Sequence, residues 1–333
     1  GVASVGGAVG LNIAYPIWRL CYIAFSLLLI GGAFAFMPER QAVDRSRHRC
    51  HAGLPHSPVS PGARPGGPGR AAGDGRLPEL SASLLGVSTA GKNLKRYQQV
   101  CGFAAGSHLP VTWPHVLAFP LHLKLLTEKA FPLPLLGLVH LRNTITQHRP
   151  IGTGENLDLS VRLGNTVKSD RGVEFDLITE ARSAGKLVWE EASTTLFRQP
   201  DGESKSSGKK TPPELERYPN TENFKAPESI GRQYARVSGD SNPIHMHALS
   251  AKAFGFPRAI AHGMWTKAHA LALLEQQEGW QASALSISCQ FKKPLLLPGT
   301  AQLNWNTGET GWDYQVLNAK GDAPHLTGRV DWF

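Results

Sequence analysis

The feature that most constrains the fold is an internal repeat. The segment KRYQQVC (95–101) resembles RQYARVS (232–238), each followed by a glycine, at a constant offset of 137 residues. Further along each copy, WPHVLAFPLHLKLL (113–126) resembles AHGMWTKAHALALL (261–274), and both are apolar at helical spacing. A duplication of this kind predicts two similar structural units that pack together.

Each copy continues with short apolar stretches rich in β-formers and separated by Gly, Asn and Asp, a pattern typical of antiparallel strands. A helix that is apolar around most of its circumference needs cover on several sides. We therefore expect an α+β fold in which each repeat wraps a curved antiparallel sheet around its long helix. The expected strand regions are 138–151, 157–182 and 186–198 in the first copy and 285–299, 301–309, 311–319 and 325–333 in the second.

Residues 1–76 differ from the rest of the chain. Residues 20–37 form a run without charge whose length is at the lower limit for a membrane-spanning helix. Arginines follow this run. Residues 50–76 are rich in Pro, Gly and Arg and are expected to form a disordered linker. Because the chain begins with Gly, two interpretations stay open: a membrane anchor with its linker, or a sequence that starts upstream of the natural protein.

The remaining chain divides into two expected repeats and a linker. We place the first repeat at residues 77–198, a polar Ser/Lys/Pro linker at 199–214, and the second repeat at 215–333. Of the net charge of +9, residues 1–76 account for eight Arg against three acidic residues, so the repeats are close to neutral. A basic surface for nucleic acid is therefore not expected. The four Cys show neither zinc nor disulfide spacing, and we expect a reduced, cytoplasmic environment.

The second repeat holds chemistry that the first lacks. Its loop VSGDSNPIH (237–245) places an acid, Asp240, five residues before an imidazole, His245. The corresponding loop of the first repeat is apolar, with FAAG at 103–106. A purely structural loop has no reason to be polar in only one copy, so Asp240 and His245 are predicted to act together as an acid/base pair. An Asp alone is more often a helix cap, and a lone loop His more often a hydrogen-bonded structural group.

The stretch YARVSGDSNPIHMHALSAKAFGFPRAIAHGMWT (234–266) resembles the hydratase signature of the MaoC-like proteins, the (R)-specific enoyl-CoA hydratases and related acyl dehydratases. The resemblance implies a double hot-dog fold in which one half keeps the site. It covers roughly residues 80–333 and leaves residues 1–76 without a counterpart. The matching positions are Tyr234, Ser238–Asp240, Asn242–His245, Ala253, Gly255–Phe256 and Ile260–Met264.

By this resemblance, Asp240 and His245 hold one water and move its protons, and Asn242 positions the loop or the water. Pro243 stiffens the turn. The backbone N–H of Gly263, at the start of a helix, would bind the thioester oxygen. Supporting roles are expected for Ser238, near the site, and for His262, which either orients the site or satisfies a buried carbonyl.

The phosphates of coenzyme A would meet Lys292 and Lys293, with Arg258 as a second candidate, although a solvated basic edge explains these residues equally well. In the first repeat, Trp113, His115 and the Phe119–Pro120 pair are expected to line an enlarged acyl-binding cavity, a role carried over from the family.

The function expected from these residues is hydration or dehydration at the 2,3 position of an acyl thioester. The alternatives are a 3-hydroxyacyl-ACP dehydratase, a hot-dog thioesterase, and a non-catalytic acyl-binding protein. Coenzyme A or an acyl carrier protein would enter only as part of the substrate, with no metal and no redox cofactor, because hydration moves protons and not electrons. Whether the chain forms a homodimer is open.

Overall fold

The computed structural model describes residues 77–135, 137–169, 171–198 and 215–333. The expected anchor at 20–37 and the expected linkers at 50–76 and 199–214 lie outside this part of the chain. Within the described ranges, none of the helices combines the length and the apolar character that crossing a membrane requires.

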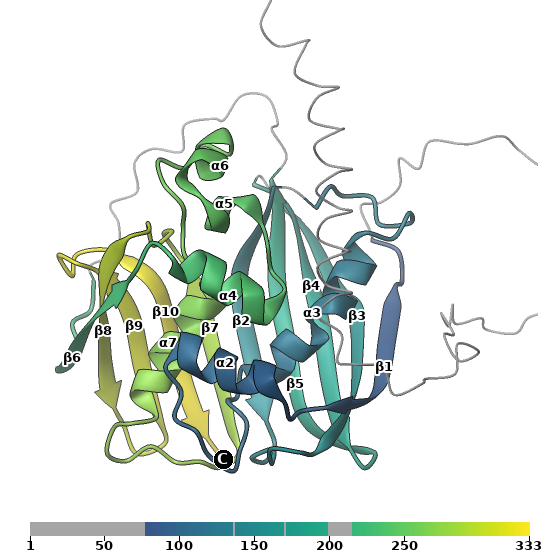
Figure 1. The fold of residues 1–333 in the computed structure, drawn as a ribbon, viewed down its shortest axis with the longest axis horizontal. Helices are drawn as coiled ribbons and strands as arrows, with labels where there is room; N and C mark the ends of the chain where they lie inside the picture. Colours follow the sequence, from purple (N-terminus) through teal and green to yellow (C-terminus); the bar gives the residue numbers. More distant parts are fainter. Residues whose placement is uncertain (1–76, 136, 170, 199–214) are drawn as a thin grey trace, which may run out of the picture.

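One antiparallel sheet of ten strands runs through the molecule in the order β1-β3-β4-β5-β2-β7-β10-β9-β8-β6 (Figure 1). The first repeat supplies five strands and the second supplies the other five, and the two sets join where β2 pairs with β7, from Arg142↔Gln290 to Gln147↔Leu285. The strands are β1 (Ser81–Ser88), β2 (Leu138–Gln147), β3 (Asn156–Ser169), β4 (Gly172–Ser183), β5 (Lys186–Arg198), β6 (Asn220–Ala226), β7 (Leu285–Phe291), β8 (Gly299–Thr307), β9 (Gly311–Asn318) and β10 (Pro324–Trp332).

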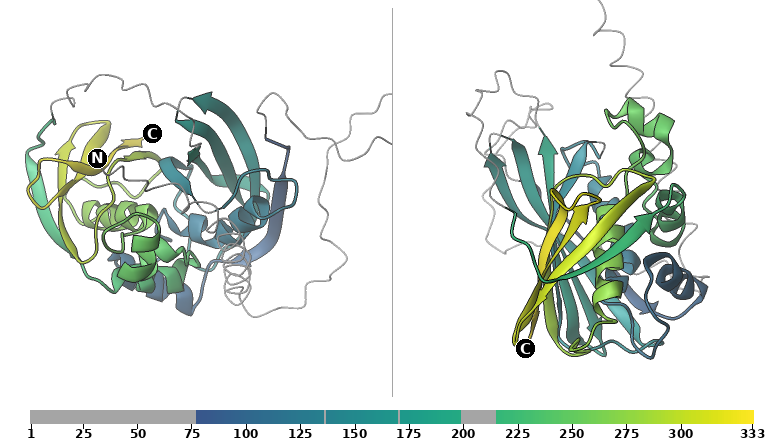
Figure 2. Two further views of the ribbon diagram at one scale, coloured as in Figure 1. Left: turned by 90° about the horizontal axis from the view of Figure 1, so that it is seen from above. Right: turned by 90° about the vertical axis from the view of Figure 1, so that its left-hand side faces the viewer.

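The sheet curves around two long helices, one from each repeat, as Figure 2 shows. These are α3 (Trp113–Leu126) and α7 (Gly263–Leu274), and both bury most of their residues. The shorter helices α2 (Lys92–Cys101) and α4 (Ile230–Ser238) are the other matched pair of the repeat, and they pack against each other. Tyr97 and Tyr234, which occupy equivalent positions, meet with ring centroids 6.2 Å apart. Two short helices, α5 (Pro243–Met246) and α6 (Ala248–Ala253), follow α4.

The predicted double hot-dog fold is confirmed, with differences in detail. The stretch 157–182 forms two strands, β3 and β4, because the chain reverses between Ser169 and Gly172. Strands β1 and β6 were not expected, since each lies at an edge of the sheet and exposes much of its length, which weakens the apolar alternation. The second long helix begins at Gly263 and not at Ala261, because the backbone of His262 is extended, with φ −63° and ψ 138°.

Candidate active site

The loop that carries Asp240 starts from a sharp turn at the end of α4. Gly239 has φ 81°, a left-handed conformation that glycine adopts without strain, and its N–H donates to the Ala235 carbonyl. Two further bonds shape the turn: the Asp240 N–H donates to Ser238 Oγ at 3.2 Å, and the Asn242 N–H donates to Asp240 Oδ1 at 3.2 Å. Ser238 therefore supports the loop through its hydroxyl, and one oxygen of Asp240 is held by the backbone.

Helix α5 places His245 next to this turn. Asn242 caps the helix, since its Oδ1 accepts from the Ile244 N–H at 3.4 Å, and Pro243 occupies the first helical turn, where its missing N–H costs nothing. Helix α4 lies so close that a Cβ on Gly231 would overlap the His245 carbonyl oxygen. The absence of a side chain at Gly231 therefore permits this close approach of α4 to the backbone of His245.

The tautomer of His245 follows from its backbone partner. Its Nδ1 lies 2.8 Å from the Ile260 carbonyl oxygen. A carbonyl oxygen only accepts, so Nδ1 carries the proton and Nε2 is left with a free lone pair. The ring also stacks on His262, with centroids 3.7 Å apart and planes 28° from parallel. His262 in turn donates from Nε2 to the Asp240 carbonyl at 2.9 Å.

The result is a compact cluster of one carboxylate and two imidazoles. Asp240, His245 and His262 each bring one oxygen or nitrogen within 4.8 Å of the others, and His262 Nε2 is 3.9 Å from Asp240 Oδ2. The Asp240 side chain is 32% exposed, whereas His245 and His262 are only 8% and 2% exposed. A molecule that arrives from solvent would therefore meet the carboxylate first, with the imidazoles behind it.

The surroundings fix the charge of each group. Burial lowers the pKa of His245 to about 3, and the neighbouring His262 lowers it further, so His245 is neutral at pH 7. Burial also lowers the pKa of His262. For Asp240, burial would raise the pKa, but the two imidazoles and the Asn242 N–H outweigh it and leave the pKa below its ordinary value. At neutral pH the cluster is one carboxylate beside two neutral rings.

The same three residues form a set of possible metal ligands, and the spacing argues against zinc. Zinc binds nitrogen and oxygen at roughly 2.0–2.2 Å, which places ligand atoms of a tetrahedral site roughly 3.4 Å apart. The three ligand atoms of this cluster lie within 4.8 Å of one another, a looser limit than that spacing. One water molecule can bridge two polar atoms over such a separation.

Gly263 lies at the first turn of α7, directly after His262. The N–H groups of a first turn have no acceptor within the helix, and the helix dipole is positive there. A Cβ on Gly263 would come within 2.9 Å of Phe291 Cε1, so the ring of Phe291 packs against this residue. The first turn of α7 thus offers a positive N–H end beside the cluster, with an aromatic wall over Gly263.

The basic residues expected to meet coenzyme A lie at the surface. Arg258, Lys292 and Lys293 are all exposed, and the Lys292 ammonium donates to Gln290 Oε1 at 2.5 Å. Their role remains a prediction.

A buried polar seam between the helices and the sheet was missed by the sequence reasoning. His115 Nδ1 lies 2.9 Å from both carboxylate oxygens of Glu191, and Asn143 Nδ2 donates to Glu191 Oε1 at 2.6 Å. The Lys267 ammonium, on α7, donates to Asn143 Oδ1 at 2.5 Å. The seam thus runs from α3 across β5 and β2 to α7. Each member is a lone polar residue in an apolar stretch, so the sequence offered only weak signals of it.

Nearby, His122 Nε2 pairs with Thr179 Oγ1 at 2.8 Å, while the buried His140 Nε2 has no partner among the described residues. The resemblance led us to expect that His115 and Phe119 line an open acyl-binding cavity. In the structure, the interior beside them is polar and hydrogen-bonded. Trp113 is also buried and donates from its indole N–H to the Thr89 carbonyl.

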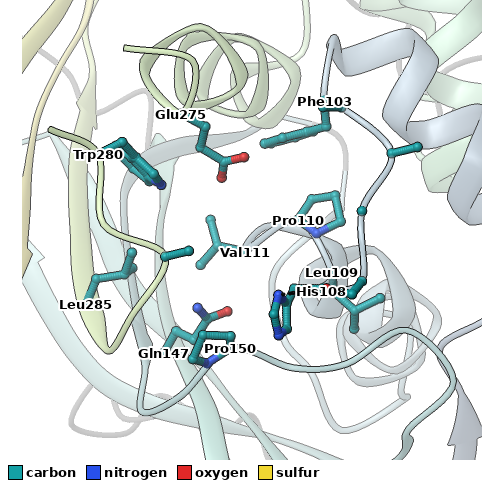
Figure 3. Close-up of a pocket in the computed structure, with 15 residues that line it drawn as sticks. Phe103, His108, Leu109, Pro110, Val111, Gln147, Pro150, Glu275, Trp280 and Leu285 are labelled. Atoms are coloured by element: carbon teal, nitrogen blue, oxygen red, sulfur yellow. Dashed lines mark hydrogen bonds between the residues drawn. The ribbon is translucent and has the colours of Figure 1, made fainter. Parts of the chain in front are cut away.

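A cavity of about 300 Å³ is lined by residues of both repeats, and neither Asp240 nor His245 is among them. Figure 3 shows the loop of the first repeat, with Phe103 and His108, facing Glu275 and Trp280 from the end of α7. Phe103 follows Gly102 as Asp240 follows Gly239, so the loop of the first repeat has a phenyl ring where the second repeat has the acid. His108 lies in an extended segment that pairs with Gly152, whereas His245 lies on α5. Burial raises the pKa of Glu275 to about 7.

The two-repeat fold and the Asp–His loop define a class, the double hot-dog proteins with a hydratase-type loop, and comparisons with known proteins agree. The chain belongs to the MaoC-like family: residues 208–323 match the model of the MaoC like domain. It is 35% identical over 258 residues to 3-hydroxyacyl-thioester dehydratase X of Mycobacterium tuberculosis, covering 77% of this chain and 90% of that protein.

Solved structures give the same result. A crystal structure of HtdX of Mycobacterium tuberculosis superposes with a TM-score of 0.66 at 33% identity, covering 76% of this chain and 100% of that one.

Enoyl-CoA hydratase 2 of Arabidopsis thaliana, a peroxisomal protein, is 29% identical over 152 residues, which is 40% of this chain and 48% of that protein.

Proposed function

We propose that the chain is a hydro-lyase that adds or removes water at the 2,3 position of an acyl thioester. The observation that supports this most is the cluster in which Asp240 and His245 bring polar atoms within 4.8 Å of each other, one ionised and one neutral. The names of its relatives, a 3-hydroxyacyl-thioester dehydratase and an enoyl-CoA hydratase, describe the same chemistry in its two directions.

In this proposal, water binds between the Asp240 carboxylate and the free Nε2 of His245, each of which accepts one hydrogen bond from it. As the water oxygen attacks C3, one of these groups takes a proton, and the pair delivers a proton to C2. The reaction is therefore balanced without a redox partner. Asn242 contributes by capping α5, which fixes His245, and His262 by holding the Asp240 backbone.

The negative charge that grows on the thioester oxygen needs a donor in place before the reaction. We assign this role to the Gly263 N–H at the first turn of α7. Coenzyme A phosphates would lie near Lys292, Lys293 and Arg258, which are exposed and charged. An acyl carrier protein would present its own phosphate to the same residues.

The test uses the purified chain with crotonyl-CoA, followed by the loss of enoyl absorbance. Asp240→Asn and His245→Gln should each lower kcat by about 10²–10⁴-fold, the usual contribution of general acid–base catalysis, with melting temperatures close to that of the parent. Release of free thiol would favour a thioesterase instead. Acyl-CoA binding without turnover would favour a non-catalytic binding protein, and crotonyl-ACP run in parallel distinguishes the carriers.

A further inference from the structure

The space beneath α3 is closed by two polar pairs that tie this helix to the sheet. His115 bonds to Glu191 on β5, and His122 bonds to Thr179 on β4. All four side chains are buried, with Glu191 2% and Thr179 0% exposed. We call these two pairs the helix clasps.

The helix clasps lie next to the candidate active site. Phe119, on α3 between the two histidines, touches the catalytic loop, since its Cδ1 is 3.5 Å from the position of a Cβ on Gly239. On its other side, the Phe119 ring is 6.4 Å from His115 and 6.3 Å from His122, centroid to centroid. One aromatic ring therefore separates the loop that carries Asp240 from the clasps.

A long acyl chain beneath α3 would have to open these pairs. The Glu191 carboxylate would then keep only its Asn143 partner while remaining buried, and a buried charge that loses a partner is strongly destabilising. An apolar chain offers no hydrogen bond in exchange, either to Glu191 or to the unpartnered Nε2 of His140.

We propose that the helix clasps set the substrate class: thioesters of short acyl groups, with His115 and Glu191 as the specificity-determining pair that ends the acyl site. This proposal rests on the function proposed above. It replaces the family expectation of an enlarged cavity in the first repeat.

The test is a chain-length series of trans-2-enoyl-CoA substrates from four to ten carbons. In a site open to the chain, each added methylene would strengthen binding by about fourfold. We instead expect kcat/KM to fall by at least about tenfold between the four-carbon and the ten-carbon substrate, a difference of the size that pocket walls impose.

Two double variants test the assignment to the clasp. H115A with E191Q removes the imidazole and neutralises the carboxylate, which opens space without leaving Glu191 charged. H115F with E191Q makes the same change of charge but keeps the space filled. We expect the first to raise the ten-carbon to four-carbon ratio by at least about tenfold and the second to leave it near the parent value.

A parent protein that turns over the ten-carbon substrate as well as the four-carbon one would overturn the proposal, whatever the variants do. Equal ratios in the two double variants would also overturn it. Calorimetric binding of butyryl-CoA and decanoyl-CoA separates this proposal from the proposed function, because it needs no turnover. Tighter binding of butyryl-CoA by a protein without hydratase activity would refute the function and support the short acyl site.

Discussion

Lys267 is the most deeply buried charge in the described part of the molecule that can be removed without touching the acid/base loop. Its side chain is on α7, one turn after Gly263, and is 0% exposed. The ammonium donates to Asn143 Oδ1 at 2.5 Å, to the Ile287 carbonyl at 3.2 Å and to the Asn143 carbonyl at 3.4 Å. Through Asn143 it faces the buried carboxylate of Glu191, which accepts from the same amide at 2.6 Å.

Replacing Lys267 by Met keeps the apolar stem and removes the charge and its donors. Asn143 Oδ1 and the Ile287 carbonyl then lose their donor, whereas Glu191 keeps its direct partners His115 and Asn143. Leaving a buried acceptor unsatisfied costs about 1–3 kcal/mol. We expect a loss of this size in the free energy of unfolding, a large fraction of the roughly 5–15 kcal/mol of a typical domain. Urea titration followed by tryptophan fluorescence measures it, since Trp189 and Trp265 are both buried.

Two controls make the result specific. K124M removes a surface lysine whose side chain is 52% exposed and pairs with Glu128 one turn away, and it should cost no more than about 0.5 kcal/mol. Adding E191Q to K267M removes both charges that Asn143 links. The double variant should therefore lose about 1–3 kcal/mol less in the free energy of unfolding than the two single losses add up to. Strict additivity, or a K267M loss below about 1 kcal/mol, would refute a coupled buried pair.

Three other predictions concern the site and its histidines. Gly231→Ala should lower both stability and kcat, because its Cβ would overlap the backbone carbonyl of His245, and thermal melts with crotonyl-CoA assays show whether the two losses occur together. Gly263→Ala should lower kcat, since its methyl would press within 3.0 Å of two Phe291 ring atoms, and adding F291L should restore part of the activity; no rescue would place the effect elsewhere. The free energy of unfolding should fall as pH drops from about 6.5 towards 4, because the unfolded chain takes up protons that the folded chain refuses. Each histidine should contribute about 1.4 kcal/mol per pH unit, measurable as urea midpoints at pH 7.5, 6 and 5, and a flat profile would contradict the low folded pKa values. These are about 3 for His122, about 4 for His140 and about 3 for His245.

The fold could be predicted from the sequence because its main elements recur in both repeats. The two long helices and most of the strands follow from apolar periodicity in stretches that recur in order. The edge strands β1 and β6 were not predicted. One face and one edge of each strand meet solvent, so the alternation that marks a half-buried strand is weak there. The candidate acid/base loop could be predicted because its polar residues lie within nine positions of each other.

The buried seam escaped for the opposite reason. His115, Asn143, Glu191 and Lys267 come from four separate elements, so only the folded chain brings them together. Taken singly, Glu191 and Lys267 look like surface residues, because charged side chains are rarely fully buried without a partner. Local pattern predicts elements, but a network between elements depends on the register of β2, β5 and β7 beneath the helices.

The seam also accounts for how the first repeat differs from the second. Aligning the two long helices places His115 opposite Gly263 and Phe119 opposite Lys267. A side chain at the Gly263 position would collide with Phe291, whereas in the first repeat the imidazole at that position turns to Glu191. The first repeat therefore lacks both parts of the proposed chemistry. It has Phe103 where the second repeat has Asp240, and His115 where the second repeat has Gly263. Of these two, His115 ties α3 to Glu191 beneath the helix, and we expect the proposed reaction to be confined to the loop 237–245, which holds Asp240.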